Sequence, residues 1–200
     1  MRVIAAVALG SVTAAVMLAG LCALAIAQSA PITLADAGGR PIARLDAHRE
    51  TVKVRDARDQ PLGEIKIQAD RVKLADAGGA ERWKVKRKDY GAEIENAGGQ
   101  RLFRIRKDKD GDWKLEDASK AVLVRVKAKS SGVELRDAGG KTIAKVKPRA
   151  GGLVFETEAG ARLGEVSGIT DVHAGLWLAL DRFSPAERAA LWAFFANVAK

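Results

Sequence analysis

The sequence predicts a mainly β protein, an antiparallel meander of about seven β-hairpins that closes into a barrel or a sandwich around a hydrophobic C-terminal helix. Three observations predict this fold class. A turn motif recurs about every twenty residues, apolar and charged residues alternate on both sides of each turn, and an almost wholly apolar helical pattern ends the chain. A fixed period of this length is typical of a repeated supersecondary unit.

Residues 1–27 have the features of a signal peptide. Arg2 precedes a run without charged residues that ends at Ala25-Ile26-Ala27, just before the polar Gln28. A charged start, an apolar run and small residues at the cleavage site are typical of secretory signals. The alternative is an uncleaved membrane anchor, because the apolar run is long enough to span a bilayer. We therefore expect an exported protein, periplasmic or secreted, that is either free or anchored through residues 3–27.

Residues 28–168 contain the hairpin repeats. The turn motif Asp-Ala-Gly-Gly, or a looser version of it, begins at Asp36, Asp56, Asp76, Asn96, Asp117, Asp137 and Glu158. Apolar residues stand two and four positions before each of the first six turns, with mostly charged residues between them, and the seventh copy slips by about one residue. This alternation is typical of strands with one buried face, and an acidic residue followed by glycine is typical of a hairpin turn. Seven hairpins give fourteen strands, and the short links between hairpins predict a meander that hides its edges by closure.

Residues 169–200 form a helical segment that we expect to pack inside the barrel. A short helix is predicted from Val172 to Leu180, after Asp171 as its cap. The sequence Ser184-Pro185-Ala186-Glu187 is a capping box that begins a second, almost entirely apolar helix over 185–199. Such a helix is buried or in a membrane, and at about 22 Å it is shorter than the ~30 Å bilayer core. The sequence therefore predicts a buried helix.

The repeated turn, as in Leu135 to Gly140, and the segment Gly175 to Asp181 together resemble the tubby-like β-barrel superfamily. Its members include tubby C-terminal domains, LURP-one-related proteins and phospholipid scramblases. The resemblance implies antiparallel strands wrapped around a central hydrophobic helix, and a basic barrel surface that engages anionic phospholipid. This chain departs from the family pattern because it has more strands and because the familiar members carry no signal peptide. Another closed or sandwiched meander is the alternative.

The composition includes few residues of the types that commonly act in catalysis. Cys22, His48 and His173 are the only cysteine and histidines of the chain, which excludes a disulfide scaffold and a Cys-based zinc site. The stretch Asp108 to Asp112 resembles the opening of a calcium loop but lacks the later ligands of an EF-hand, so a solvated hairpin link is expected. We predict no catalytic, cofactor-binding or metal-binding residues, and hence no enzyme. The core is the expected place of His173 and of all four tryptophans, Trp83, Trp113, Trp177 and Trp192.

A net charge of +9 indicates an affinity for anionic partners. Six cations on the outward phase of successive strands are the candidate contacts for such a partner: Lys84, Lys86, Arg104, Arg106, Arg125 and Lys127. The expected partner is anionic lipid or another acidic component of the cell envelope. Nucleic acid is not expected, because the protein is exported and has no exposed aromatic series. Solubility and the protection of strand edges are the alternative explanation of these charges.

The sequence thus favours a non-enzymatic envelope module that binds or supports other components through a basic β-face. A scaffold or assembly protein, whose repeats present surface to a protein partner, is the alternative. An enzyme built from loop carboxylates and the basic face is a third hypothesis, for which no residue pattern positions a site.

Overall fold

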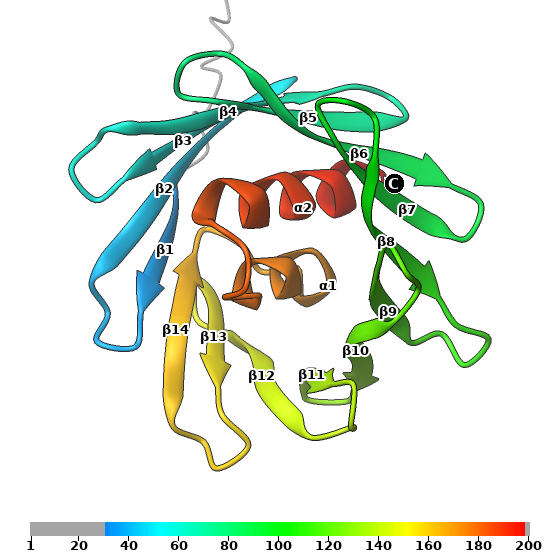
Figure 1. Cartoon of the computed structure of the whole chain (residues 1–200). Coiled ribbons are helices and arrows are strands. Elements are labelled where there is room, and N and C mark those ends of the chain that lie inside the picture. Colours follow the sequence, from blue (N-terminus) through cyan, green and yellow to red (C-terminus); the bar gives the residue numbers. More distant parts are fainter. Residues whose placement is uncertain (1–30, 199–200) are drawn as a thin grey trace, which may run out of the picture.

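In the computed structural model, which describes residues 31–198, fourteen strands form one closed antiparallel barrel (Figure 1). Every strand pairs with its neighbours in sequence, and β1 pairs with β14 to close the ring. The structure therefore confirms the predicted meander and selects the barrel over the sandwich. The predicted signal peptide, residues 1–27, lies outside the described residues.

The strands are short and evenly spaced along the chain. In order they are β1 (Ile32–Asp36), β2 (Pro41–His48), β3 (Thr51–Asp56), β4 (Pro61–Ile67), β5 (Arg71–Asp76), β6 (Glu81–Lys88), β7 (Gly91–Asn96), β8 (Arg101–Lys107), β9 (Trp113–Asp117), β10 (Val122–Lys129), β11 (Gly132–Asp137), β12 (Thr142–Arg149), β13 (Gly152–Glu156) and β14 (Arg162–Ser167). The helical segment follows as α1 (Val172–Gly175), the 3₁₀-helix η1 (Leu176–Ala179) and α2 (Pro185–Val198).

The acidic residue of each turn organises the turn backbone. In the first turn, Asp36 Oδ1 accepts hydrogen bonds from the amides of Gly38 at 2.9 Å and of Arg40 at 3.0 Å. Gly39 adopts a φ of 77°, which glycine tolerates without steric cost. In the two copies without a glycine at this position, Asp59 and Lys120 adopt similar φ values of 64° and 73°. The bonds to the acidic side chain therefore hold the left-handed conformation even where glycine is missing.

The seventh turn begins one residue earlier than predicted. The sequence pattern placed its acid at Glu158, but the Gly160 amide donates to the Thr157 carbonyl, and the Ala161 amide donates to Thr157 Oγ1 at 3.0 Å. A threonine hydroxyl here accepts the bond that a carboxylate accepts in five of the other turns and that the amide oxygen of Asn96 accepts in the sixth. The turn thus requires a side-chain acceptor and does not require a charge.

A β-bulge lies at the same position in all seven hairpins, two residues into the returning strand. One residue of each returning strand is skipped in the pairing: Ile42, Leu62, Arg82, Leu102, Leu123, Ile143 and Leu163. Bulges bend a strand and increase its local twist. Seven equivalent bends curl the meander, so that its two ends meet.

The helical segment fills the barrel (Figure 1). Helix α2 packs against β2 to β6, whereas α1 and η1 pack on β11 and β12. Trp177 and Phe194 are almost completely buried, at 1% and 2% exposure, together with the inward residues of all the strands. This arrangement confirms the predicted burial of the C-terminal helix. Within residues 31–198, no helix is long and apolar enough to cross a bilayer.

The short helix before α2 is less regular than predicted. It consists of one α-helical turn capped by Asp171, whose Oδ1 accepts from the amides of His173 and Ala174, followed by one 3₁₀ turn. The capping box of α2 is confirmed, because Glu187 Oε2 accepts from the Ser184 amide at 2.8 Å. A tight 3₁₀ turn suits a segment that must reverse inside a barrel.

Candidate functional site

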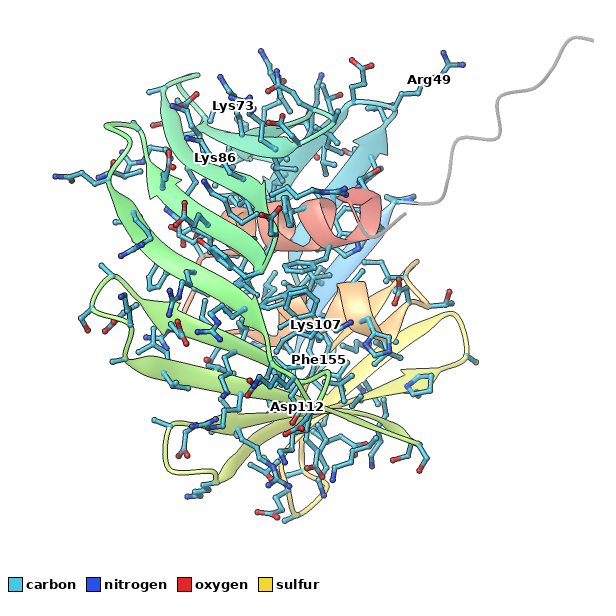
Figure 2. All side chains as sticks on the ribbon, turned by 90° about the vertical axis from the view of Figure 1, so that its right-hand side faces the viewer. Arg49, Lys73, Lys86, Lys107, Asp112 and Phe155 are labelled. Carbon is cyan, nitrogen blue, oxygen red and sulfur yellow. The ribbon has the colours of Figure 1, made fainter. Side chains whose placement is uncertain are left out.

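The outer face of the barrel is covered by charged side chains, among them Lys73 and Lys86 (Figure 2). Four of the six cations singled out in the sequence form ion pairs on this face: Lys84 with Glu81 at 2.8 Å, Lys86 with Glu95 at 2.7 Å, Arg104 with Glu116, and Lys127 with Asp112 at 3.7 Å. Their charges are therefore partly neutralised by the protein itself. The six residues do not form one continuous positive surface.

The remaining two candidates, Arg106 and Arg125, lie in a line of four cations that crosses four adjacent strands. Arg106 on β8 is opposite Lys114 on β9, Lys114 is opposite Arg125 on β10, and Arg125 is opposite Arg136 on β11. We call these four residues the basic row. Like charges directly opposite each other in a sheet are destabilising, so the four cations of the row repel one another.

The acids near the basic row neutralise only part of it. Lys114 forms an ion pair with Asp108, and its hydrogen bond holds the pKa of that carboxyl below the usual range. Arg136 donates to Glu134 at 2.7 Å, which lowers the pKa of Glu134. Arg125 stands between these two pairs and has no ion pair with any residue of the described chain. The centre of the row is thus a cation without an acidic partner in 31–198.

The rows on either side of the basic row differ from it, because positive and negative charges alternate along them. One of them runs Lys86, Glu93, Arg104 and Glu116, and the other runs Lys127, Glu134, Lys145 and Glu156. Cross-strand pairs of opposite charge stabilise a sheet. The basic row therefore breaks a pattern that the surrounding surface follows.

A second line of cations, Lys66, Lys73 and Lys84, crosses β4 to β6 but is neutralised. Glu81 lies within 3.3 Å of Lys73 and 2.8 Å of Lys84. The hydrogen bond from Lys84 lowers the pKa of Glu81 from its ordinary value. This line serves as an internal comparison, since Lys73 and Lys84 share Glu81 and Lys66 pairs with Glu64, whereas Arg125 has no acidic partner among the described residues.

A polar cluster next to the basic row fixes the side chains of β7 and β8. Tyr90 donates its hydroxyl proton to Glu93 at 2.7 Å, and the Arg104 guanidinium lies 5.9 Å from the centre of the Tyr90 ring. Burial and the bond to Glu93 together raise the pKa of Tyr90 to about 12. The same bond lowers the pKa of Glu93. The cluster keeps Arg104 engaged and away from any external partner.

The link from Asp108 to Asp112 does not gather its carboxylates around a point. Asp108 pairs with Lys114, and Asp112 lies 3.7 Å from Lys127. No three metal-ligating side chains come together anywhere in the described part of the chain. Two of the three aspartates are thus paired with lysines on the outer face, in keeping with the solvated link expected from the sequence.

Two members of the basic row, Lys114 and Arg136, were not among the candidates from the sequence. Both stand on strands that lead into a turn, whereas the six candidates all stand on returning strands. The number of residues between a turn acid and a given side chain indicates which residue lies opposite it on the paired strand. A bulge in every hairpin shifts this pairing by one residue. Only the observed pairing places the four cations in one line.

Two expectations for the core were wrong. His173 is exposed because it lies at the surface of the single turn α1 instead of in a regular helix. Trp113 is half-buried at the end of β9, while Trp83, Trp177 and Trp192 are buried as expected. Both misplaced side chains line the same cavity at one end of the barrel.

Comparison with known proteins gives little likeness. No protein-family model matches the chain, and no curated protein matches it. Among solved structures, an Arabidopsis thaliana protein studied by X-ray crystallography matches at 15% sequence identity and a TM-score of 0.38. The match covers 77% of this chain and 91% of that chain. These values are too low to assign a family.

Proposed function

We propose that the protein is a non-enzymatic binding module of the cell envelope that engages anionic phospholipid through the basic row. The observation that carries this proposal is the line of four cations whose central member, Arg125, has no acidic partner among residues 31–198. Phosphate groups placed along the row would relieve the repulsion between its members.

The length of the row favours an anionic surface over a single small anion as its binding partner. Neighbouring strands lie about 4.8 Å apart, so four cations on four strands extend over roughly 14 Å. One monovalent anion cannot reach all of them. A membrane leaflet carrying several anionic headgroups can, and each Lys or Arg held near such a surface contributes about 1 kcal/mol.

The tubby-like resemblance belongs to the same proposal. A closed antiparallel barrel around a C-terminal helix is the architecture that this resemblance implies, and phospholipid engagement is the function that it implies. The fourteen strands depart from the family pattern. Export through residues 1–27 would place the basic row in the envelope, next to anionic lipid.

Vesicle flotation of residues 28–200, the chain that remains after the predicted cleavage, tests the proposal without the apolar run of residues 3–27. We expect binding to vesicles that contain phosphatidylserine and little binding to phosphatidylcholine alone. Arg125→Glu changes the charge of the row by two units and is expected to weaken binding by roughly 10- to 30-fold. Lys53→Glu is the matched control, because Lys53 is exposed on β3 and has no ion pair in the described chain.

Two outcomes would overturn this function. Equal binding to neutral vesicles that does not respond to salt would exclude an electrostatic mechanism. An equal loss for Arg125→Glu and Lys53→Glu would mean that net charge, and not the row, determines binding. A scaffold that pairs through sheet edges receives no support from the fold, since each of the fourteen strands is paired on both sides.

A further inference from the structure

A cavity of about 260 Å³ opens at the end of the barrel where the hairpins are linked to one another. Strands β8 to β11 form one wall of it, and α1, η1 and the end of α2 form the other. Figure 2 shows Lys107, one of its lining residues, at the edge where these strands meet the enclosed helical segment. The basic row lies on the outer face of the same strands, so the cavity is a separate feature.

The cavity contains a buried donor that lacks an acceptor. Trp177 lines the cavity and is 1% exposed, and its indole Nε1 finds no hydrogen-bond acceptor among the described residues. Leaving a buried N–H unsatisfied costs about 1–3 kcal/mol, so such groups are rare in folded proteins. The nitrogen itself has almost no accessible surface, so a ligand in the cavity packs against the indole ring and does not reach its N–H.

The wall around this donor is aromatic and apolar. Trp177 stacks on Phe195 with ring centres 4.5 Å apart, and Phe195 meets the edge of Trp113 at 5.4 Å. Val126 and Val133 line the opposite side. Trp113 stays half-buried even though it belongs to this cluster. The apolar body of a small ligand would cover the exposed part of its ring.

Two polar side chains of the lining form no ion pair or hydrogen bond within the described chain: Lys107, which is a donor, and His173, whose imidazole can donate or accept. The Lys107 ammonium lies 5.9 Å from the centre of the Trp113 ring and forms no ion pair within the described chain. Asp171 is the one acid of the lining, and its Oδ1 already accepts from the amides of His173 and Ala174. A ligand that complements this lining carries an acceptor with negative charge.

We propose that this cavity binds a small carboxylate with an apolar or aromatic body. The carboxylate oxygens accept hydrogen bonds from Lys107 Nζ, and the body packs against Trp113, Phe195 and the ring of Trp177. The volume is just below the ~300–1,000 Å³ of pockets for drug-sized ligands, so the site excludes a phospholipid with two chains. The inference therefore stands apart from the proposed binding to membranes and can fail or succeed alone.

The indole N–H signals in a ¹⁵N–¹H correlation spectrum of the full chain provide the test. The four tryptophans give four such signals, which Trp→Phe variants assign. The probes are octanoate and 3-phenylpropionate, each compared with its neutral alcohol. We expect the carboxylates to shift the signals of Trp113 and Trp177, whose rings line the cavity, while Trp83 and Trp192 stay in place.

Two variants separate the charge from the indole donor. Lys107→Gln is expected to weaken carboxylate binding about tenfold and to leave the weak binding of the alcohol unchanged. Lys109→Gln is the matched control, because Lys109 is an exposed lysine two residues further along the same link. Trp177→Phe keeps a stacked aromatic ring and removes an N–H that the ligand does not reach, so we expect carboxylate binding to change little.

Three results would overturn the proposal. The first is a spectrum in which neither carboxylate moves the Trp113 signal at concentrations up to about 10 mM. The second is equal binding of acid and alcohol together with no effect of Lys107→Gln. The third is a common shift of all four signals, which would indicate a general effect on the protein.

Discussion

Arg125 has a cation as its cross-strand neighbour on both sides. Lys114 and Arg136 lie directly opposite it on the two neighbouring strands, and no acid of the described chain neutralises it. Lys84 has the same place in its hairpin, but Glu81 lies 2.8 Å away. Two cations in equivalent positions of the repeat therefore have opposite effects on the stability of the sheet.

Arg125→Thr is expected to raise the free energy of unfolding by about 0.5 kcal/mol at low ionic strength, because it removes the repulsion from Lys114 and Arg136. The gain should shrink in high salt, which screens exposed charges. Lys84→Thr is the control and should lower stability by a similar amount, since it leaves Glu81 with one fewer partner. Urea unfolding at two salt concentrations measures both; a loss of stability in Arg125→Thr would contradict this account.

Tyr90 is the single tyrosine of the chain, so its ionisation can be followed by near-ultraviolet absorbance. Its pKa is raised to about 12 by burial and by the bond to Glu93, from an ordinary value of 10.0. A raised pKa means that the protonated phenol stabilises the fold fully below pH 10, and that this contribution is lost as the pH rises through 12. We expect a native midpoint near 12 and a lower one in Glu93→Gln. Identical midpoints would exclude a role for Glu93.

The sequence predicts which side chains face outward but not which of them meet. The alternation of apolar and charged residues correctly assigns Arg106 and Arg125 to the outer face. Whether a given cation meets an acid or another cation depends on the strand register, and the bulges shift that register inside every hairpin. Lys114 and Arg136 were missed for this reason. The exposed position of His173 was missed because a single helical turn has no periodic pattern to read.

At the scale of the elements, α2 is the part best predicted from the sequence. Its start at Ser184 follows from the capping box, and its burial follows from an apolar surface on nearly all sides. The strands were also well predicted, because each hairpin has a turn residue with a side-chain acceptor and an alternating pattern on both sides. The seventh turn was misplaced, since Thr157 is a weaker signal than aspartate.

Ser184→Ala is expected to lower the free energy of unfolding by about 1 kcal/mol, a typical loss for an N-cap residue. The Ser184 hydroxyl bonds Glu187 Oε2 at 2.9 Å and accepts from the Glu187 amide at 3.4 Å, so the substitution breaks both bonds. Ser130→Ala in an exposed link is the control and should change stability little. Thermal or urea unfolding compares the two, and equal stabilities would show that the cap contributes nothing.

For the molecule as a whole, the sequence left open whether the meander forms a barrel or a sandwich. Both fold classes hide one apolar face and have short links. What distinguishes them is the seven-fold repetition of one bulge together with the helical segment inside the ring. Neither the bulge nor the β1–β14 pairing has a strong local sequence signal, because the skipped residues are mostly ordinary Leu and Ile.

Deleting residues 184–200 is expected to leave an aggregating chain without a cooperative transition. The strands would lose Trp192 and Phe194, and truncating one such aromatic side chain costs about 3–5 kcal/mol out of a typical ~5–15 kcal/mol. Circular dichroism and gel filtration of the truncated chain measure the outcome. A monomeric truncation that melts cooperatively would show that the barrel does not need its helix.

The closure of the ring through β1 and β14 also has a consequence for the order of folding. All other strand pairs join neighbours in sequence and can form as soon as each hairpin has been synthesised, whereas Thr33 pairs with Ser167. Contacts between sequence neighbours form quickly, and the single distant pairing must close a loop that contains nearly the whole barrel. The edge of β1 is therefore open during synthesis, and the strand that is made first acquires its second neighbour last.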